Sequence, residues 1–376
     1  MIYRTLGRTG LQVSQLGFGA MRLPMARQGE QDRINRELAV PMIHRAFEAG
    51  VNYIDSAVVY GDGDSEEAVG EALKGWRDKI IVSTKNHCFG ASEKEWRGHL
   101  DDSLRRLGID CIDMYHHHAI SWECFEKDIR PRVSAWMAQA KREGLIRHIC
   151  VSFHDNNDAL RKVIDADYAD VITLQYNLLD RQLEDGIAYA HAKGIGVVVM
   201  GPVGGGRLGE PSEALMDGAM RTPELALRFV LANPYISVAL SGMSTMEQVG
   251  ENLQIAKDPV ALRPENRKAI EARLEHLKKL SGLYCTGCGY CMPCPQGVEI
   301  SDVFDAYNRG RVYGLWNSAR HKYRHVHEKG HAAAACAECG ACEPKCPQHI
   351  PIRERLKEAE KALAWESERS TRGHTE

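Results

Sequence analysis

Eight of the twelve cysteines fall in two short clusters near the end of the 376-residue chain. The first cluster is CTGCGYCMPCP at 285–295, and the second is CAECGACEPKCP at 336–347. The first three cysteines of the two clusters are 51 residues apart, the fourth cysteines are 52 apart, and CPQGVEI at 294 returns as CPQHIPI at 346. This duplication predicts two similar halves, each with three thiols on a tight loop and a fourth thiol leading into a helix.

Two kinds of metal centre compete for these thiols. A zinc ion accepts four thiolates in a tetrahedron, and C-x2-C pairs are common at zinc sites. A 4Fe–4S cube also takes four thiolates, and the run C-x2-C-x2-C-x3-C-P is its bacterial signature. The second cluster matches that run in full, whereas the first has two residues instead of three before its last cysteine. Because a three-cysteine loop with a remote fourth thiol is natural for a cube and unusual for zinc, the sequence predicts two 4Fe–4S clusters.

In two-cluster ferredoxins the fourth cysteine of each half binds the opposite cluster. By that rule one cluster would be held by Cys285, Cys288, Cys291 and Cys346, and the other by Cys336, Cys339, Cys342 and Cys294. The short spacing in the first half leaves this exchange open. Four histidines lie between the halves, at 321, 325, 327 and 331, and a polar helix or loop explains them better than a ligand role.

Four residues nearer the N-terminus have side chains that could together catalyse the reduction of a carbonyl group. They are Asp55 and Tyr60 in IDSAVVYG, Lys85 in STKNH and His118 in MYHHH. A hydride that reaches a carbonyl carbon leaves an alkoxide, and a tyrosine can protonate it, although the unperturbed tyrosine pKa is about 10. A lysine ammonium nearby would lower that pKa, a carboxylate would hold the lysine, and a histidine would polarise the carbonyl oxygen. The alternative is a lysine–aspartate pair that only supports the fold, beside an unrelated tyrosine and histidine.

These four residues can meet only if their elements converge. Short apolar runs alternate with stretches that have helical spacing, and the runs occupy 15–21, 52–57, 80–86, 112–119, 148–154, 171–177, 196–203 and 236–243. Eight strand–helix units in about 250 residues fit an α/β fold of the (β/α)8 TIM-barrel type, in which the strand ends meet at one mouth. No GxGxxG follows the first run, which argues against a doubly wound sheet.

The pattern changes after residue 258 and predicts four parts. They are a barrel at 1–258, a linking helix at 259–284, a small, mainly helical, ferredoxin-like iron–sulfur domain with two clusters at 285–368, and a frayed tail at 369–376. The net charge of −3 gives no reason to expect a nucleic-acid or membrane partner. Because no signal peptide or membrane span is visible, the cysteines predict a reducing, cytoplasmic location, and the four scattered ones are interpreted as small buried hydrophobes.

The motifs GVNYIDSAVVYG, VSTKNH, IDMYHHH, VSFHD, LQYN and GPVGGGRL resemble, in order, those of the aldo-keto reductases over nearly all of residues 1–258. The tail resembles that of the bacterial and archaeal branch with a C-terminal ferredoxin-type 4Fe–4S domain. The resemblance implies an NAD(P)H-dependent oxidoreductase that acts on a small aldehyde or ketone. It places Asp55, Tyr60, Lys85 and His118 on the family's catalytic tetrad, with Tyr60 as the proton donor.

The resemblance also implies contacts to NADP or NAD. Ser152 and Gln175 would hydrogen-bond the nicotinamide carboxamide, and the ring would be bordered by Gly19, Ala20 and Met21, with Asp55 and Met200 nearby. The pyrophosphate would be wrapped by a glycine-rich loop of Gly201, Pro202, Val203, Gly204, Gly205 and Gly206. The adenosine end would be held by Gly242, Met243, Ser244, Gln248, Glu251 and Asn252.

Three departures from the family pattern involve four positions. Phe153 replaces an asparagine, and Met200 stands where many members have an aromatic ring. Members selective for NADP supply a lysine and an arginine where this chain has Gly242 and Gln248. Because a phosphate site without cations is weak, we expect at most a modest preference for NADP, although Ser244 could still contact a phosphate.

The role of the cysteine-rich tail has competing interpretations. Nicotinamides deliver two electrons together, whereas each cube accepts one, and no flavin motif is visible to mediate between them. In one hypothesis the clusters relay electrons from an external ferredoxin or flavin donor. In the other they only stabilise the fold of the tail, because metal binding supplies much of the free energy of folding in such domains. A third hypothesis is a ferredoxin-linked electron-transfer protein whose barrel is a docking scaffold or works with a flavin or quinone-like acceptor; the intact tetrad argues against it.

Overall fold

The computed structural model describes residues 1–28, 31–86, 90–204, 208, 221–258, 268, 270–272, 275, 285, 291–346 and 350–364. Contacts divide the chain into two units. The first comprises Met1–Gly206 and Ala226–Pro264, and the second comprises Arg207–Leu225 and Glu265–Glu376. The domain limits expected from the sequence remain proposals. Within the described part of the chain, no helix is long and apolar enough to cross a membrane.

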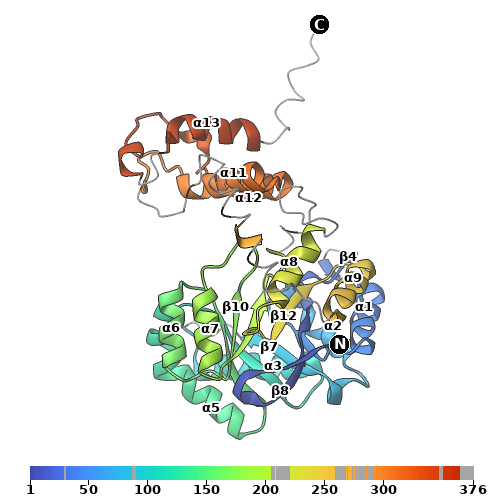
Figure 1. The fold of residues 1–376 in the computed structure, drawn as a ribbon. Helices are drawn as coiled ribbons and strands as arrows, with labels where there is room; N and C mark the ends of the chain where they lie inside the picture. The colour runs from blue at the N-terminus through green and yellow to red at the C-terminus, as the bar shows by residue number, and fades with distance from the viewer. Residues whose placement is uncertain are drawn as a thin grey trace. The chain divides into compact units, whose positions relative to one another are not determined.

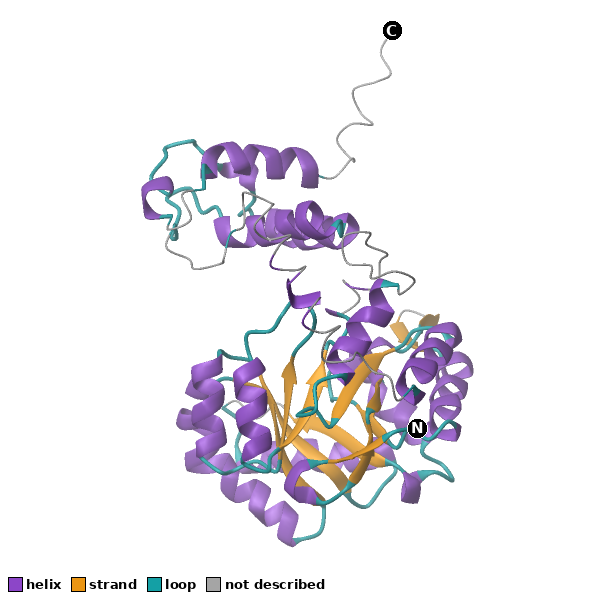
Figure 2. Cartoon of the chain, viewed as in Figure 1, coloured by secondary structure: helices purple, strands orange, loops and turns teal. Residues whose placement is uncertain are grey.

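Eight parallel strands of the first unit close into a barrel (Figures 1 and 2). They are β3 (Leu16–Gly19), β6 (Tyr53–Asp55), β7 (Ile81–Asn86), β8 (Ile112–Ile120), β9 (Ile146–Phe153), β10 (Val171–Gln175), β11 (Gly196–Met200) and β12 (Val238–Gly242). Each lies at one of the eight apolar runs, and the order around the barrel is β10-β11-β12-β3-β6-β7-β8-β9. The pairing of β9 with β10 closes the ring, so the predicted (β/α)8 fold is confirmed.

Helices cover the outside of the barrel (Figure 2). They are α1 (Arg36–Glu48), α2 (Ser65–Ala72), α3 (Glu93–Leu107), α4 (Trp122–Cys124), a π-helical turn at Phe125–Val133, α5 (Ser134–Arg142), α6 (Asn157–Asp165), α7 (Glu184–Ala192), α8 (Thr222–Leu231) and α9 (Met246–Lys257). Local sequence sets several of their ends. At α3, for example, Ser92 and Glu95 form a reciprocal capping box, and Gly108 in the left-handed conformation ends the helix.

Two β-hairpins stand outside the barrel and were not expected from the sequence. The first pairs β1 (Tyr3–Thr5) with β2 (Gln12–Ser14). Leu6 and Val13 from this segment share a buried cluster with Val171 and Val238, the first residues of β10 and β12, so the hairpin closes the N-terminal end of the barrel. The second pairs β4 (Met25–Gln28) with β5 (Gln31–Ile34) and follows β3, so it belongs to the opposite, C-terminal end.

Over the described residues 291–346 and 350–364, the second unit is built on three helices and short irregular segments. The helices are α11 (Ile300–Tyr313), α12 (Trp316–Glu328) and α13 (Ile352–Leu363), with 3-10 turns at Ala333–Ala335 and Glu343–Lys345. They enclose a core that includes Val303, Phe304, Tyr323 and Leu356. Six of the clustered cysteines belong to this core or pack against it: Cys285, Cys291, Cys294, Cys336, Cys342 and Cys346. Three of the four intervening histidines lie on α12, as a polar helix predicts. In the linking segment the described residues 268, 270–272 and 275 are helical.

Candidate functional site

The four predicted catalytic residues lie together at the C-terminal ends of neighbouring strands. Asp55 ends β6, Lys85 and His118 lie near the ends of β7 and β8, and Tyr60 begins the turn Tyr60–Gly63. The Lys85 ammonium lies 2.5 Å from Asp55 Oδ2 and 4.8 Å from the centre of the Tyr60 ring. The rings of Tyr60 and His118 meet edge to face, with 6.0 Å between their centroids.

Lys85 is buried, with 1% of its surface exposed, and therefore depends on polar partners. Its ammonium donates to Asp55 Oδ2 and, at 2.7 Å, to the backbone carbonyl of Ser56. The other oxygen of Asp55 accepts from the Ser83 hydroxyl at 2.7 Å. Since Asp55 and Ser83 are register partners of β6 and β7, the sheet itself fixes the carboxylate and, through it, the ammonium.

The electrostatics of Lys85 and Tyr60 correct one expectation. Burial lowers the pKa of Lys85, but the combined effect of Asp55 and Tyr60, which raise it, is larger. The pKa therefore stands above its ordinary value, and the side chain stays charged. Burial also raises the pKa of Tyr60, and Lys85 opposes this only in part. The net pKa of Tyr60 is therefore above its ordinary value, not below it as the sequence suggested. A raised pKa keeps the phenol protonated, which is the form that a proton donor requires.

Only the last histidine of the MYHHH motif lies near Tyr60. The two preceding ones, His116 and His117, are buried, and desolvation is the main cause that lowers the pKa of each to about 3. His116 contacts the Thr173 hydroxyl at 3.0 Å, and His117 contacts the Tyr168 hydroxyl at 2.8 Å. Both imidazoles are therefore buried and neutral, and they lie on opposite faces of β8, so the repeated histidines have different roles.

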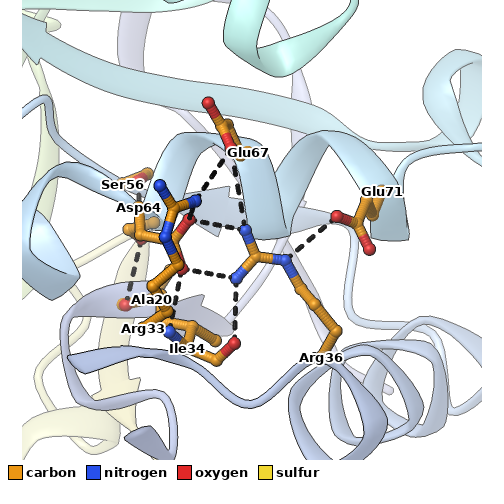
Figure 3. Close-up of polar contacts among 9 residues, drawn as sticks. Ala20, Arg33, Ile34, Arg36, Ser56, Asp64, Glu67 and Glu71 are labelled. Atoms are coloured by element: carbon orange, nitrogen blue, oxygen red, sulfur yellow. Dashed lines mark hydrogen bonds and ion pairs between the residues drawn. The ribbon is translucent and has the colours of Figure 1, made fainter. Parts of the chain in front are cut away.

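A network of charges holds the turn that carries Tyr60 (Figure 3). Both oxygens of Asp64, which is 6% exposed, accept from the Arg36 guanidinium at 2.7 Å, and Oδ2 also accepts from the backbone N–H of Ile34 at 2.8 Å. Burial raises the pKa of Asp64, but the bonds from Arg36 and Ile34 prevail and keep it below its ordinary value. Sequence reasoning missed this network, and the acidic run DGDSEE at 62–67 was its available signal.

Two further contacts tie this turn to other parts of the site. Gly61 adopts φ +57°, and a Cβ added there would lie 2.7 Å from Ile34 Cδ1, so the turn packs tightly on the end of β5. The Ser65 hydroxyl donates to the carbonyl of Ala20 at 3.2 Å and accepts from the Ser56 hydroxyl at 2.9 Å. The position of Tyr60 is therefore coupled to β3, β5 and β6.

The predicted nicotinamide and pyrophosphate residues lie on adjacent strand ends. Gln175 and Met200 are register partners at the ends of β10 and β11, and Ser152 lies near the end of β9. Gly201 adopts φ +65°, which strains any other residue, and a Cβ there would lie 2.6 Å from Gln175 Oε1 and would have to displace the glutamine amide. The turn continues through Pro202 and Val203, with the N–H of Gly204 donating to the carbonyl of Gly201 at 2.8 Å. Gly205 and Gly206 lie outside the described residues.

The predicted adenosine residues surround the start of α9. Gly242 ends β12 and pairs with Gly19 of β3. The Ser244 N–H donates to Gln248 Oε1 at 2.7 Å, and the Asn252 amide donates to the Ser241 hydroxyl at 2.9 Å. Glu251 lies on α9, Met243 is buried and Met21 is 58% exposed. Arg22 packs against Gly242 and was missed by sequence reasoning, although it directly follows Gly19, Ala20 and Met21.

In the second unit, thiols from both halves of the duplication line one pocket. Cys336, Cys339 and Cys342 of the second half share it with Cys291 and Cys294 of the first. Among the described residues no three candidate ligands are grouped as a single metal ion would require. A set of thiols spread around a pocket fits a polynuclear cluster. Cys294 lines it as the predicted exchange requires, but so does Cys291, which that exchange assigns to the other cluster, so the division of the ligands stays a prediction. Cys288 lies outside the described residues.

Comparisons with known proteins match both units. The aldo/keto reductase family model matches residues 15–220, and a 4Fe-4S dicluster domain model matches 284–350. An L-galactose dehydrogenase of Arabidopsis thaliana is 31% identical over 316 residues, which cover 74% of this chain and 96% of that protein. An uncharacterised oxidoreductase of Schizosaccharomyces pombe is 28% identical over 288 residues, which cover 71% of this chain and 91% of that protein. The solved structure of an aldo-keto reductase from Bacillus halodurans is 30% identical in sequence, with a TM-score of 0.63. The match covers 73% of this chain and 96% of that one.

Proposed function

The chain is an oxidoreductase of the aldo/keto reductase family with a 4Fe-4S dicluster domain, and we propose that it reduces a small aldehyde or ketone with Tyr60 as the proton donor. Family membership implies an NAD(P) cofactor, and the dicluster domain implies two 4Fe–4S clusters. The observation that carries the proposal is the buried Lys85–Asp55 pair, which lies against Tyr60 beside His118 at the strand ends.

Each of the four side chains has a definite task in this reaction. The reduced nicotinamide, when bound, supplies a hydride that forms the new C–H bond and leaves the carbonyl oxygen as an alkoxide. His118 polarises that oxygen, and Tyr60 transfers its phenolic proton to it, forming the O–H bond of the alcohol product. The Lys85 ammonium stabilises the resulting phenolate, and Asp55 holds the ammonium in place. Solvent then returns a proton to Tyr60.

The dicluster domain suggests electron transfer as a second activity of the same chain. Its Cys339 is exposed while also lining the thiol pocket, so a cluster bound there would lie close to the surface. That position favours exchange with an external one-electron donor such as a ferredoxin or flavin protein. Cys294, Cys336, Cys339 and Cys342 are the proposed ligands of this cluster, and Cys285, Cys288, Cys291 and Cys346 are those of the other.

Replacement of Tyr60 tests the carbonyl-reductase proposal. Tyr60→Phe should lower the single-turnover rate of NAD(P)H oxidation by a panel of small aldehydes and ketones by about 100-fold or more, a typical contribution of acid catalysis. The dissociation constants of NADPH and NADH should stay within about twofold, because the lost hydroxyl acts on the substrate oxygen. Tyr235→Phe is the matched control, since Tyr235 is 42% exposed and lies outside the site, and it should keep the full rate.

Two results would contradict the proposal. One is a full rate in Tyr60→Phe, which would remove the tyrosine from the chemistry. The other is tight nucleotide binding by the unmodified protein without turnover of any carbonyl in the panel. If that protein nevertheless accepts electrons from a reduced ferredoxin, the barrel would serve the clusters as a scaffold.

A further inference from the structure

Arg353 comes from the start of α13 and lines the thiol pocket of the second unit. We propose that its guanidinium raises the reduction potential of the cluster bound by Cys336, Cys339 and Cys342, and makes this cluster the first of the two to accept an electron. This inference rests on the proposed electron-transfer role of the dicluster domain. It gives an order of reduction to two clusters whose duplicated ligand motifs are nearly equivalent.

The charged end of Arg353 lies against the loop that carries the thiols. Gly340 stands between Cys339 and Cys342, and a Cβ built on it would lie 3.5 Å from Arg353 Cζ and 3.6 Å from Nε and Nη1. These are ordinary van der Waals distances to the guanidinium itself rather than to the aliphatic stem. Because a guanidinium stays charged at all physiological pH values, a permanent positive charge is held beside the thiol ligands.

Glu343, which directly follows Cys342, fixes the guanidinium in this place. Its Oε2 accepts from Arg353 Nη2 at 2.8 Å, and its Oε1 accepts from the backbone N–H of Arg353 at 3.1 Å. Among the described residues that line the pocket, Arg353 is included and Glu343 is not. The pair therefore presents its positive member to the thiols.

The other charges near this loop do not remove that effect. Glu338 of the same loop pairs with Lys357 of α13 at 2.7 Å. Lys345 also lines the pocket, but it directly precedes Cys346, a proposed ligand of the other cluster, so its charge acts on both clusters. The two glutamates of the loop, which alone would disfavour an added electron, are thus each matched by a cation of α13.

The first half of the duplication has no counterpart of this cation in its sequence. No charged residue occurs from 283 to 298, the stretch that contains its four cysteines, and the 52-residue offset of the fourth cysteines puts Ser301 in the place of Arg353. A 4Fe–4S cluster gains one negative charge when it takes up an electron, so a nearby cation stabilises the reduced form and raises the potential. The cluster of the second half should therefore be reduced first.

A potentiometric titration of the full-length protein, purified without oxygen, tests this assignment. Dithionite supplies the electrons, and EPR spectroscopy follows the two one-electron steps. Arg353→Gln removes the charge and should make the cluster of the higher-potential step at least threefold harder to reduce, a fall of about 28 mV for a one-electron couple, while the lower step stays unchanged. Arg353→Lys keeps the charge and should leave both steps close to those of the wild type.

Arg355→Gln is the matched control, because it removes an equal charge from the same helix. Arg355 pairs with Glu358 at 2.6 Å and is not among the residues that line the thiol pocket. Neither step should move in this variant. Iron and sulfide analysis should give about eight of each per chain in every variant, so that a changed potential cannot reflect a lost cluster.

The salt dependence separates the charge from a structural effect of the substitution. The screening length falls from about 10 Å at 0.1 M salt to about 3 Å at 1 M. Because the Arg353 side chain is 45% exposed, the difference between the wild type and Arg353→Gln should shrink at 1 M KCl. A difference that persists in full would show that the substitution displaces the ligand loop, and would overturn the assignment.

The outcomes also distinguish this inference from the role on which it rests. An unchanged higher-potential step in Arg353→Gln would overturn the assignment, and so would an equal shift of both steps or an equal shift in Arg355→Gln. Each of these results leaves the electron-transfer proposal standing, because both clusters are still reduced. An unmodified protein whose clusters accept no electron from dithionite would overturn the electron-transfer proposal, and the assignment with it.

Discussion

Asp64→Asn should loosen the turn that carries Tyr60, because Asp64 is the buried acceptor of three hydrogen bonds. An asparagine keeps one oxygen but places an NH2 group against the Arg36 guanidinium, so one charge-assisted bond is lost and the other is weakened. Bonds to charged groups are worth about 1.5–3 kcal/mol each, and Arg36 remains 22% exposed and can regain water. We therefore expect the free energy of unfolding to fall by about 2–3 kcal/mol.

Urea unfolding and hydrogen exchange measure this effect globally and locally. The N–H of Asp64 donates to the carbonyl of Gly61 at 3.0 Å, so a peptide spanning residues 60–68 reports directly on the turn and should lose protection. The rate of carbonyl reduction should fall about tenfold, since displacing a reacting group by about 1 Å can cost up to 100-fold. The matched control is Asp32→Asn, whose exposed pair with Arg27 at 3.6 Å should contribute no more than about 1 kcal/mol.

The pH dependence has a defined sign. The pKa of folded Asp64 lies below its ordinary value, so the carboxylate contributes stability at pH values above its unfolded pKa of about 3.9. That contribution is lost as pH falls through the lower, folded pKa. The stability difference between the wild type and Asp64→Asn should therefore be full at pH 7 and shrink below about pH 4. If Asp64→Asn costs no more than Asp32→Asn at pH 7 and the peptide keeps its protection, the clamp does not hold the turn.

Two further predictions concern the nucleotide loop and the thiol pocket. Gly201→Ala should weaken binding of both NADPH and NADH at least tenfold, because φ +65° strains an alanine and its methyl group would push the Gln175 amide aside. Gly98→Ala on α3, where nothing lies within 4 Å, should bind both nucleotides normally. Equal binding in the two variants would show that the loop adapts. Cys294→Ala should lower the iron content from about eight to about four per chain, whereas Cys111→Ala should keep all of it, as iron and sulfide analysis would show. A full complement of iron in Cys294→Ala would exclude that cysteine as a ligand.

The sequence by itself determined the features that depend on local pattern. Strand-length apolar runs alternating with amphipathic stretches are a property of consecutive residues, so all eight barrel strands could be placed. Once the barrel is known, the ends of β6, β7 and β8 must share one mouth, which brings Asp55, Lys85 and His118 together. The cysteine repeat is likewise local, because its spacing reflects how a short loop surrounds a cluster.

Only the tertiary structure decided features that depend on residues distant in the sequence. The pKa of Tyr60 follows from burial by the surrounding elements, and the presence of Lys85 alone suggested the opposite direction. The Arg36–Asp64 pair joins residues 28 positions apart, and the contact between Arg22 and the β12–α9 loop spans more than 200 positions. Neither contact has a sequence period that could reveal it, because each arises where strand ends and their loops pack around a single mouth.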